Sequence, residues 1–177
     1  MKLFAPAPSN AVRLAWRALG LLTLGNGVYA LFVLGMGLAL LIAPDATMTA
    51  VGVREDVDRS RILPAMRVLV LIGLAGAFLV HRLLKTLRAI VSTIGDGDAF
   101  VAANADRLET LGRQLIGLEL LHLAVGLVTS LGSTAQQPLD VDWNFSVTPW
   151  LTILLVFVLA QVFREGARLR RELDGVV

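Results

Sequence analysis

Residues 18–43 read ALGLLTLGNGVYALFVLGMGLALLIA and contain no charged side chain. An α-helix rises about 1.5 Å per residue, and the hydrocarbon core of a bilayer is about 30 Å thick. About 20 apolar residues are therefore enough to cross it, and this stretch has 26. The stretch predicts a membrane-spanning helix.

Three more apolar stretches follow, at residues 62–84, 112–131 and 143–163. The first of these has its basic residues towards its ends, the second contains Glu119 and His122, and the third has no charged residue. We therefore predict an all-α fold, a four-transmembrane-helix bundle that forms one integral membrane domain over residues 1–177. The connection 44–61 is long enough to contain a short helix.

The composition supports a membrane protein and excludes several kinds of site. Of the 177 residues, 56% are hydrophobic and 17% are charged, whereas soluble domains are about 45–50% apolar and about 25% charged. The absence of cysteine excludes a disulfide scaffold, a thiolate metal site and a cysteine nucleophile, and two histidines argue against a multi-histidine metal centre. We expect no cofactor and no metal, and we find no nucleophile–base pair that would indicate an enzyme.

The second and third helices are predicted to extend beyond the membrane as a hairpin. Apolar residues recur at spacings of three and four over residues 82–94, and the helical pattern resumes after the turn at residues 95–98, where Asp98 is a candidate helix cap. Helices over 62–94 and 99–131 would be antiparallel. The tip of this hairpin, about residues 85–111, would stand in the cytoplasm.

The distribution of lysine and arginine predicts the orientation. Short loops that are rich in these residues stay in the cytoplasm. Twelve of the sixteen basic residues lie in the N-terminal tail, the hairpin tip and the C-terminal tail. We therefore expect a multi-pass membrane protein with both termini in the cytoplasm. The excess of positive charge then reflects topology and contact with membrane lipids, and we expect no direct binding of nucleic acid.

Two stretches carry a family resemblance: GDGDAFVAANADRLETLGRQLIGLEL at residues 95–120 and LAQVFREGARLRREL at residues 159–173. They resemble a bacterial family of small four-span membrane proteins, domain-of-unknown-function family 2975. The residues that carry the resemblance are Gly97, Phe100, Asn104, Leu108, Gly112 and the run Phe163-Arg164-Glu165-Gly166. The resemblance extends from the first span to the tail, although members commonly have a proline where this chain has Ala99.

The resemblance implies no reaction, because the family has none assigned. Genes of such proteins often lie beside a gene for a small helix-turn-helix regulator of the Cro/C1 type. The resemblance therefore implies a cytosolic helix-turn-helix transcription factor as a partner, which the membrane protein would bind or sequester.

The intramembrane polar residues are the first candidate site. Ionisable groups inside a bilayer usually face a partner or water and often mark function. Counted from the inner ends of their helices, Asn26, Tyr29, Glu119 and His122 fall at similar depths. They would form a proton-responsive or ligand-binding layer with Glu119 as the titrating group, or a packing layer that fixes helix register. A hairpin that turns near residue 96 places residue 74 opposite Glu119.

The second candidate site is a docking surface for the partner on the cytoplasmic hairpin and the basic tail. Two of its members have an alternative role, since Phe100 and Asn104 would either lock the hairpin tip or contact the partner. The candidate docking residues are Arg82, Lys85, Arg88, Phe100, Asn104, Arg107, Arg164, Arg168 and Arg171.

Two functions of different classes follow from these sites. The first is a non-enzymatic regulatory membrane protein that sequesters a helix-turn-helix regulator. The alternative is a small transporter or channel built around the polar layer, which requires a homo-oligomer because four helices rarely enclose a pathway.

Overall fold

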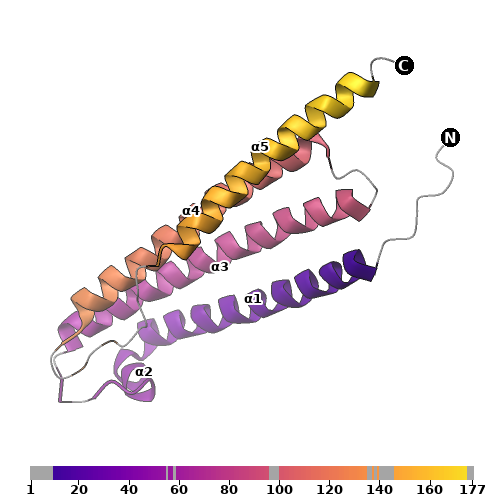
Figure 1. Cartoon of the computed structure of the whole chain (residues 1–177). Helices are drawn as coiled ribbons and strands as arrows, with labels where there is room; N and C mark the ends of the chain where they lie inside the picture. The colour runs from indigo at the N-terminus through magenta and orange to yellow at the C-terminus, as the bar shows by residue number, and fades with distance from the viewer. Residues whose placement is uncertain are drawn as a thin grey trace. The chain divides into compact units, whose positions relative to one another are not determined.

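The protein is all-α in the residues that the computed structural model describes, which are 10–54, 56–57, 59–95, 100–134, 137, 139 and 146–174. Five helices follow one another along the chain (Figure 1): α1 (Asn10–Ile42), α2 (Pro44–Ala50), α3 (Arg59–Gly95), α4 (Ala102–Gly132) and α5 (Thr148–Asp174).

Four of these helices are long and apolar enough to cross a membrane: α1, α3, α4 and residues Thr148–Leu173 of α5. The prediction of four spans is therefore confirmed, and the chain is a multi-pass membrane protein. The short helix expected in the connection 44–61 is α2, which begins with a proline at a position where no intrahelical N–H is lost.

Some predicted features lie outside the described residues. These are the turn residues 96–99, which include the Asp98 cap, and the first three residues of the predicted fourth span, 143–145. Ser146 and Val147 are described but precede the helix, which begins at Thr148. Pro149 lies in the first turn of α5, where it is well tolerated.

The chain divides into two compact units. The first unit combines residues 1–24, 80–117 and 146–177, and the second combines 25–79 and 118–145. Each unit has its own apolar core. In the second unit Leu40 of α1, Met48 of α2 and Ile62 of α3 are almost completely buried against one another.

The core of the first unit joins three helices. Ile90 of α3, Leu108 and Leu111 of α4, and Ala160 of α5 are each less than 9% exposed and pack in one cluster. Helices α4 and α5 lie side by side in this unit, as Figure 1 shows. The packing brings together segments that are about 50 residues apart in the sequence, and it fixes the geometry around the hairpin tip.

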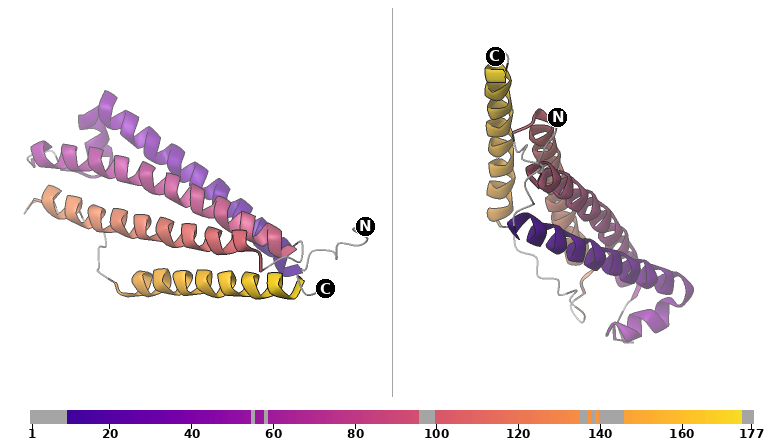
Figure 2. Two further views of the ribbon diagram at one scale, coloured as in Figure 1. Left: turned by 90° about the horizontal axis from the view of Figure 1, so that it is seen from above. Right: turned by 90° about the vertical axis from the view of Figure 1, so that its right-hand side faces the viewer.

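Helices α3 and α4 are antiparallel in both units, and their courses can be followed in Figure 2. Four contacts between them join residues whose numbers add up to 196 or 197: Thr93 with Asn104, Ala89 with Arg107, Gly76 with Leu121, and Ala65 with Gly132. The contacts confirm an antiparallel pair of long helices. Half of these sums is about 98, so the midpoint between facing residues of α3 and α4 lies near residue 98. This midpoint is later than the predicted turn near residue 96, in keeping with the start of α4 at Ala102.

Candidate functional site

Asn104 lies at the centre of a polar network at the hairpin tip. Its side chain is 0% exposed. Its Nδ2 donates to Oγ1 of Thr93 at 2.8 Å, and its Oδ1 accepts from Nη1 of Arg107 at 2.8 Å. The same Arg107 nitrogen also donates to the carbonyl oxygen of Ala89 at 3.2 Å. The network ties the first turn of α4 to the last turns of α3, and of the two roles left open for Asn104 its burial favours the lock.

An aromatic contact joins the start of α4 to the end of α5. The rings of Phe100 and Phe163 have centroids 5.1 Å apart and an interplanar angle of 34°. Cδ1 of Phe100 is 2.8 Å from the position that a Cβ on Gly166 would occupy. A side chain at residue 166 would therefore collide with the ring, and glycine allows the close approach.

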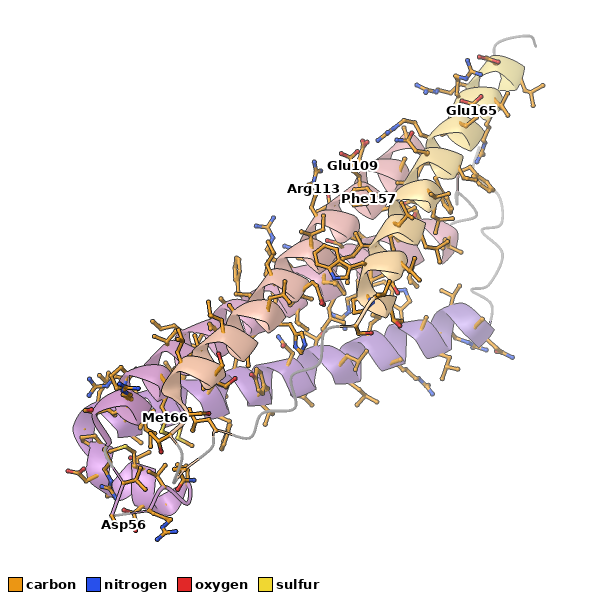
Figure 3. All side chains as sticks on the ribbon, turned by 60° about the vertical axis from the view of Figure 1, so that its left-hand side comes forward. Asp56, Met66, Glu109, Arg113, Phe157 and Glu165 are labelled. Atoms are coloured by element: carbon orange, nitrogen blue, oxygen red, sulfur yellow. The ribbon has the colours of Figure 1, made fainter. Side chains whose placement is uncertain are left out.

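A second close approach lies deeper in the same unit. The ring of Phe157 on α5 lies over Gly112 on α4, with Cζ 2.7 Å from the position of a Cβ at residue 112. Figure 3 shows Phe157 on α5 beside the part of α4 that carries Glu109 and Arg113. The contact requires a residue without a side chain, and Gly112 supplies it.

Ion pairs join the same two helices at the surface. Nη2 of Arg164 donates to Oε2 of Glu109 at 2.8 Å and lies 3.5 Å from a carboxylate oxygen of Asp106. Arg113 donates to the other oxygen of Glu109 at 3.2 Å, and both residues are labelled in Figure 3. Arg164 is therefore neutralised within the fold and is not a free cation for a partner.

The four residues of the predicted polar layer all lie in the second unit. Nδ2 of Asn26 donates to the carbonyl oxygen of Ala77 at 3.0 Å, and the hydroxyl of Tyr29 lies 3.3 Å from the Cβ position of Gly73. Both therefore face α3. Glu119 is 8% exposed and His122 is exposed. In the described part of the chain, neither makes a hydrogen bond or an ion pair.

The helix register corrects which α3 residue lies opposite Glu119. The α3–α4 contacts of the second unit pair residues whose numbers add up to 197, which places position 78 and not 74 at that level. The difference is four residues, or about 6 Å along the helix. Position 78 is next to Ala77, which accepts the hydrogen bond from Asn26. Asn26 and Glu119 therefore lie beside neighbouring residues of α3. The function of the polar layer stays a prediction.

The comparisons with known proteins identify the family. A family model described as "Protein of unknown function (DUF2975)" matches residues 49–177. The chain belongs to the DUF2975 family. The match begins in α2, so α1 lies outside it, whereas the resemblance described above extends to the first span. No curated protein and no solved structure matches the chain.

The described residues of the DUF2975 pattern converge in the first unit. Phe100 contacts Phe163 and Gly166, and Asn104 is bonded to Thr93. Leu108 belongs to the core, Gly112 and Arg164 join α4 to α5, and Glu165 pairs with Arg168 within α5. Gly97 lies outside the described residues. The pattern by which the family was recognised therefore builds the packing of α4 against α3 and α5.

The predicted docking residues fall into two groups. Four are buried or half-buried and have partners within the fold: Arg88 stacks over the ring of Trp16 at 5.5 Å, and Asn104, Arg107 and Arg164 are bonded as described above. The other five side chains are exposed, although Arg168 pairs with Glu165, Nε of Arg171 donates to the carbonyl oxygen of Ala167, and Phe100 packs on Phe163. These five are Arg82, Lys85, Phe100, Arg168 and Arg171.

Sequence reasoning missed the partners in the network. Thr93 and the carbonyl of Ala89 were not candidates, although Thr93 and Asn104 are equally far from the centre of the hairpin. Polar residues at equal distances from a turn face each other in an antiparallel helix pair. Their positions in the sequence could therefore have been used to predict the contact. The described residues contain no group of three or more histidine, aspartate or glutamate side chains that could hold a metal ion.

Proposed function

We propose that this DUF2975 protein is a non-enzymatic regulatory protein of the bacterial inner membrane that holds a cytosolic helix-turn-helix transcription factor. Both termini and the hairpin tip face the cytoplasm in this proposal. The orientation rests on the distribution of basic residues, twelve of which lie on that side. The partner rests on the family resemblance, because genes of such proteins often neighbour a regulator of this type.

One observation carries the proposal: the first unit is a tightly packed platform that presents cations. Asn104 and the Phe100–Phe163 contact fix the end of α3 and the start of α4 against α5. Lys85 on α3 and Arg171 on α5 remain exposed on this platform. A rigid surface presents its charges at fixed positions, which lowers the entropic cost of binding a partner.

The mechanism follows from the charge of the partners. A helix-turn-helix protein binds DNA through basic residues, because DNA phosphates are anionic. A basic platform therefore favours acidic surfaces of the regulator that lie away from its DNA-reading helix. Binding at the membrane would keep the regulator away from its operator until a signal weakens the contact.

Capture of the regulator by the purified protein tests this proposal. The tagged full-length chain is held in detergent and exposed to the regulator encoded beside it. We expect the wild type to retain the regulator and the double variant Lys85→Glu/Arg171→Glu to lose it. Neither residue belongs to the buried network, so the variant should fold normally. Arg54→Glu/Arg61→Glu is the control with the same change in charge, because both arginines are exposed but lie in the second unit.

The results separate the outcomes clearly. Loss of capture in the double variant alone supports docking on the platform. Failure of the wild type to retain the regulator refutes the proposed partner. Equal loss in the Arg54/Arg61 control would show that net charge governs binding, and the platform would then have no specific role.

One observation favours a second candidate, a small oligomeric transporter or channel. Glu119 is 92% shielded from solvent and makes no hydrogen bond or ion pair within the described residues. An unpaired carboxyl at such a position in a membrane helix is costly to keep without a use. Proton or ion flux into liposomes that disappears in Glu119→Gln would support this function. Absence of flux in the wild type would refute it.

A further inference from the structure

Charge is segregated between two sides of the first unit. The described ion pairs of this unit all lie within α4 and α5, where Glu109 and Glu165 are among the carboxylates that neutralise arginines. Residues 10–24 of α1 and 80–95 of α3 contain no aspartate or glutamate. These two segments carry five cations, which are Arg13, Arg17, Arg82, Lys85 and Arg88.

Arg88 occupies an unusual position between the two segments. Its guanidinium carbon is 5.5 Å from the ring centroid of Trp16, and its Nη2 is 3.3 Å from the Cβ position of Gly20. Its Nε is buried and has no hydrogen-bond partner among the described residues. The guanidinium of Arg88 makes no hydrogen bond or ion pair with the described residues, so its charge is left for an anion outside the chain.

The depth of this group matches the phosphates of a bilayer. The charge-free stretch of α1 begins at residue 18, so Trp16 and Arg17 stand at the boundary of the apolar region. Tryptophan is enriched at this level, where the headgroups begin. Arg88 contacts α1 next to the same boundary, because it approaches Gly20. Two guanidinium groups from two helices therefore lie at the depth of lipid phosphates.

The surface beside these cations is shaped for a headgroup. A hollow of about 500 Å³ is lined by Asn10, Arg13, Leu14 and Arg17. Leu14 is 69% exposed at this hollow, on the side of Arg17 that is predicted to face the cytoplasm. We centre the site on Arg17 and Arg88, which stand at the boundary of the apolar region.

We propose that this surface binds one anionic phospholipid of the phosphatidylglycerol class. Its phosphate diester would accept hydrogen bonds from the guanidinium groups of Arg17 and Arg88. Arg13 would contact the rim of the headgroup, and Trp16 would hold the guanidinium of Arg88 in place through the cation–π contact. Basic pockets between transmembrane helices on the cytoplasmic side are suited to such headgroups. The proposal does not depend on the regulatory function.

Native mass spectrometry of the full-length protein in detergent tests the site. The protein is titrated with phosphatidylglycerol and, separately, with phosphatidylcholine of the same acyl chains. We expect the wild type to prefer phosphatidylglycerol. Each arginine near an anionic headgroup is worth about fivefold in affinity, so Arg17→Gln should weaken binding about fivefold and Arg17→Gln/Arg88→Gln about thirtyfold. Arg113→Gln is the control, because Arg113 is an exposed arginine of α4 in the same unit.

Several results would overturn the proposal. Arg17 is exposed, so the single variant should fold and its result is decisive even if the double variant does not fold. If Arg17→Gln binds phosphatidylglycerol as tightly as the wild type, the site is refuted. If Arg113→Gln weakens lipid binding as much as Arg17→Gln does, the preference is a general effect of charge and no specific site exists. Soluble glycerol 3-phosphate serves as a competitor. If it displaces phosphatidylglycerol at equal concentration, the site binds free phosphate esters and not a lipid.

Discussion

The hydrogen-bond network at the hairpin tip leads to a quantitative prediction. Asn104 makes one neutral hydrogen bond to Thr93 and one charge-assisted bond to Arg107, and it is completely buried. A neutral bond contributes about 1 kcal/mol and a bond to a charged group about 1.5–3 kcal/mol. We therefore expect Asn104→Ala to lower the free energy of unfolding by about 3 kcal/mol. Thr93→Val keeps the shape of the side chain and should cost about 1–2 kcal/mol, because it removes the hydroxyl that accepts from the Asn104 amide.

A double-mutant cycle isolates the contact itself. The stability of the wild type, the two single variants and Thr93→Val/Asn104→Ala is measured by unfolding in mixed micelles with rising SDS and followed by far-ultraviolet circular dichroism. Because the two side chains lose the same bond, the double variant should cost at least about 1 kcal/mol less than the sum of the single variants.

A matched control distinguishes this contact from the ordinary effect of a threonine in a helix. Thr86 lies in α3 and donates only to the carbonyl oxygen of Arg82 in its own helix. Thr86→Val should therefore change stability by less than about 0.5 kcal/mol. A coupling energy below about 0.5 kcal/mol, or an Asn104→Ala variant as stable as the wild type, would refute the role of Asn104 as a lock.

Two further predictions concern packing and pH. Gly112→Ala places a Cβ 2.7 Å from the ring of Phe157 and should be destabilising, because overpacking costs about 1–3 kcal/mol and helix propensity returns only about 1 kcal/mol. Gly27→Ala is the control: its Cβ would have nothing within 4 Å, so this variant should be stabilising. The same micelle unfolding measures both, and a Gly112→Ala variant as stable as the wild type would contradict the close approach. The hydrogen bond from Arg54 holds the pKa of Asp56 below its usual value, so its small stabilisation is present above about pH 4 and is lost as the pH falls through the folded pKa. Stability measured from pH 6 to pH 2 should therefore fall slightly less for Asp56→Asn than for the wild type, and identical curves would show that this exposed pair contributes nothing.

Hydrophobic periodicity was enough to predict the long helices but not their register. The predicted helices at 62–94 and 99–131 differ from α3 and α4 by at most three residues at any end. That small difference at the start of α4 moves the centre of the hairpin by about two residues. In an antiparallel pair, moving the midpoint by two residues moves the residue opposite a given position by four. The α3 position opposite Glu119 is therefore 78 and not 74, a difference of about one helical turn.

The charged residues were the least predictable part of the candidate site. A sequence shows where an arginine is but not which carboxylate it meets. Arg164 pairs with Glu109, which is 55 positions earlier, and this contact exists only because α5 packs against α4. The cation–π contact between Arg88 and Trp16 likewise joins α3 to α1. The sequence pattern therefore does not show which cations are already paired within the fold.

The family pattern and the proposed binding surfaces occupy different parts of the first unit. The described pattern residues from Phe100 to Gly166 build contacts of α4 with α3 and α5, and their effect is to position helices. The cations of the proposed lipid site lie on α1 and α3, and α1 lies outside the family match. Packing residues fix a common scaffold, while residues that face outward determine what is bound to it. We therefore expect proteins with this pattern to share the locked hairpin and to differ in lipid preference according to the residues at positions 13, 17 and 88.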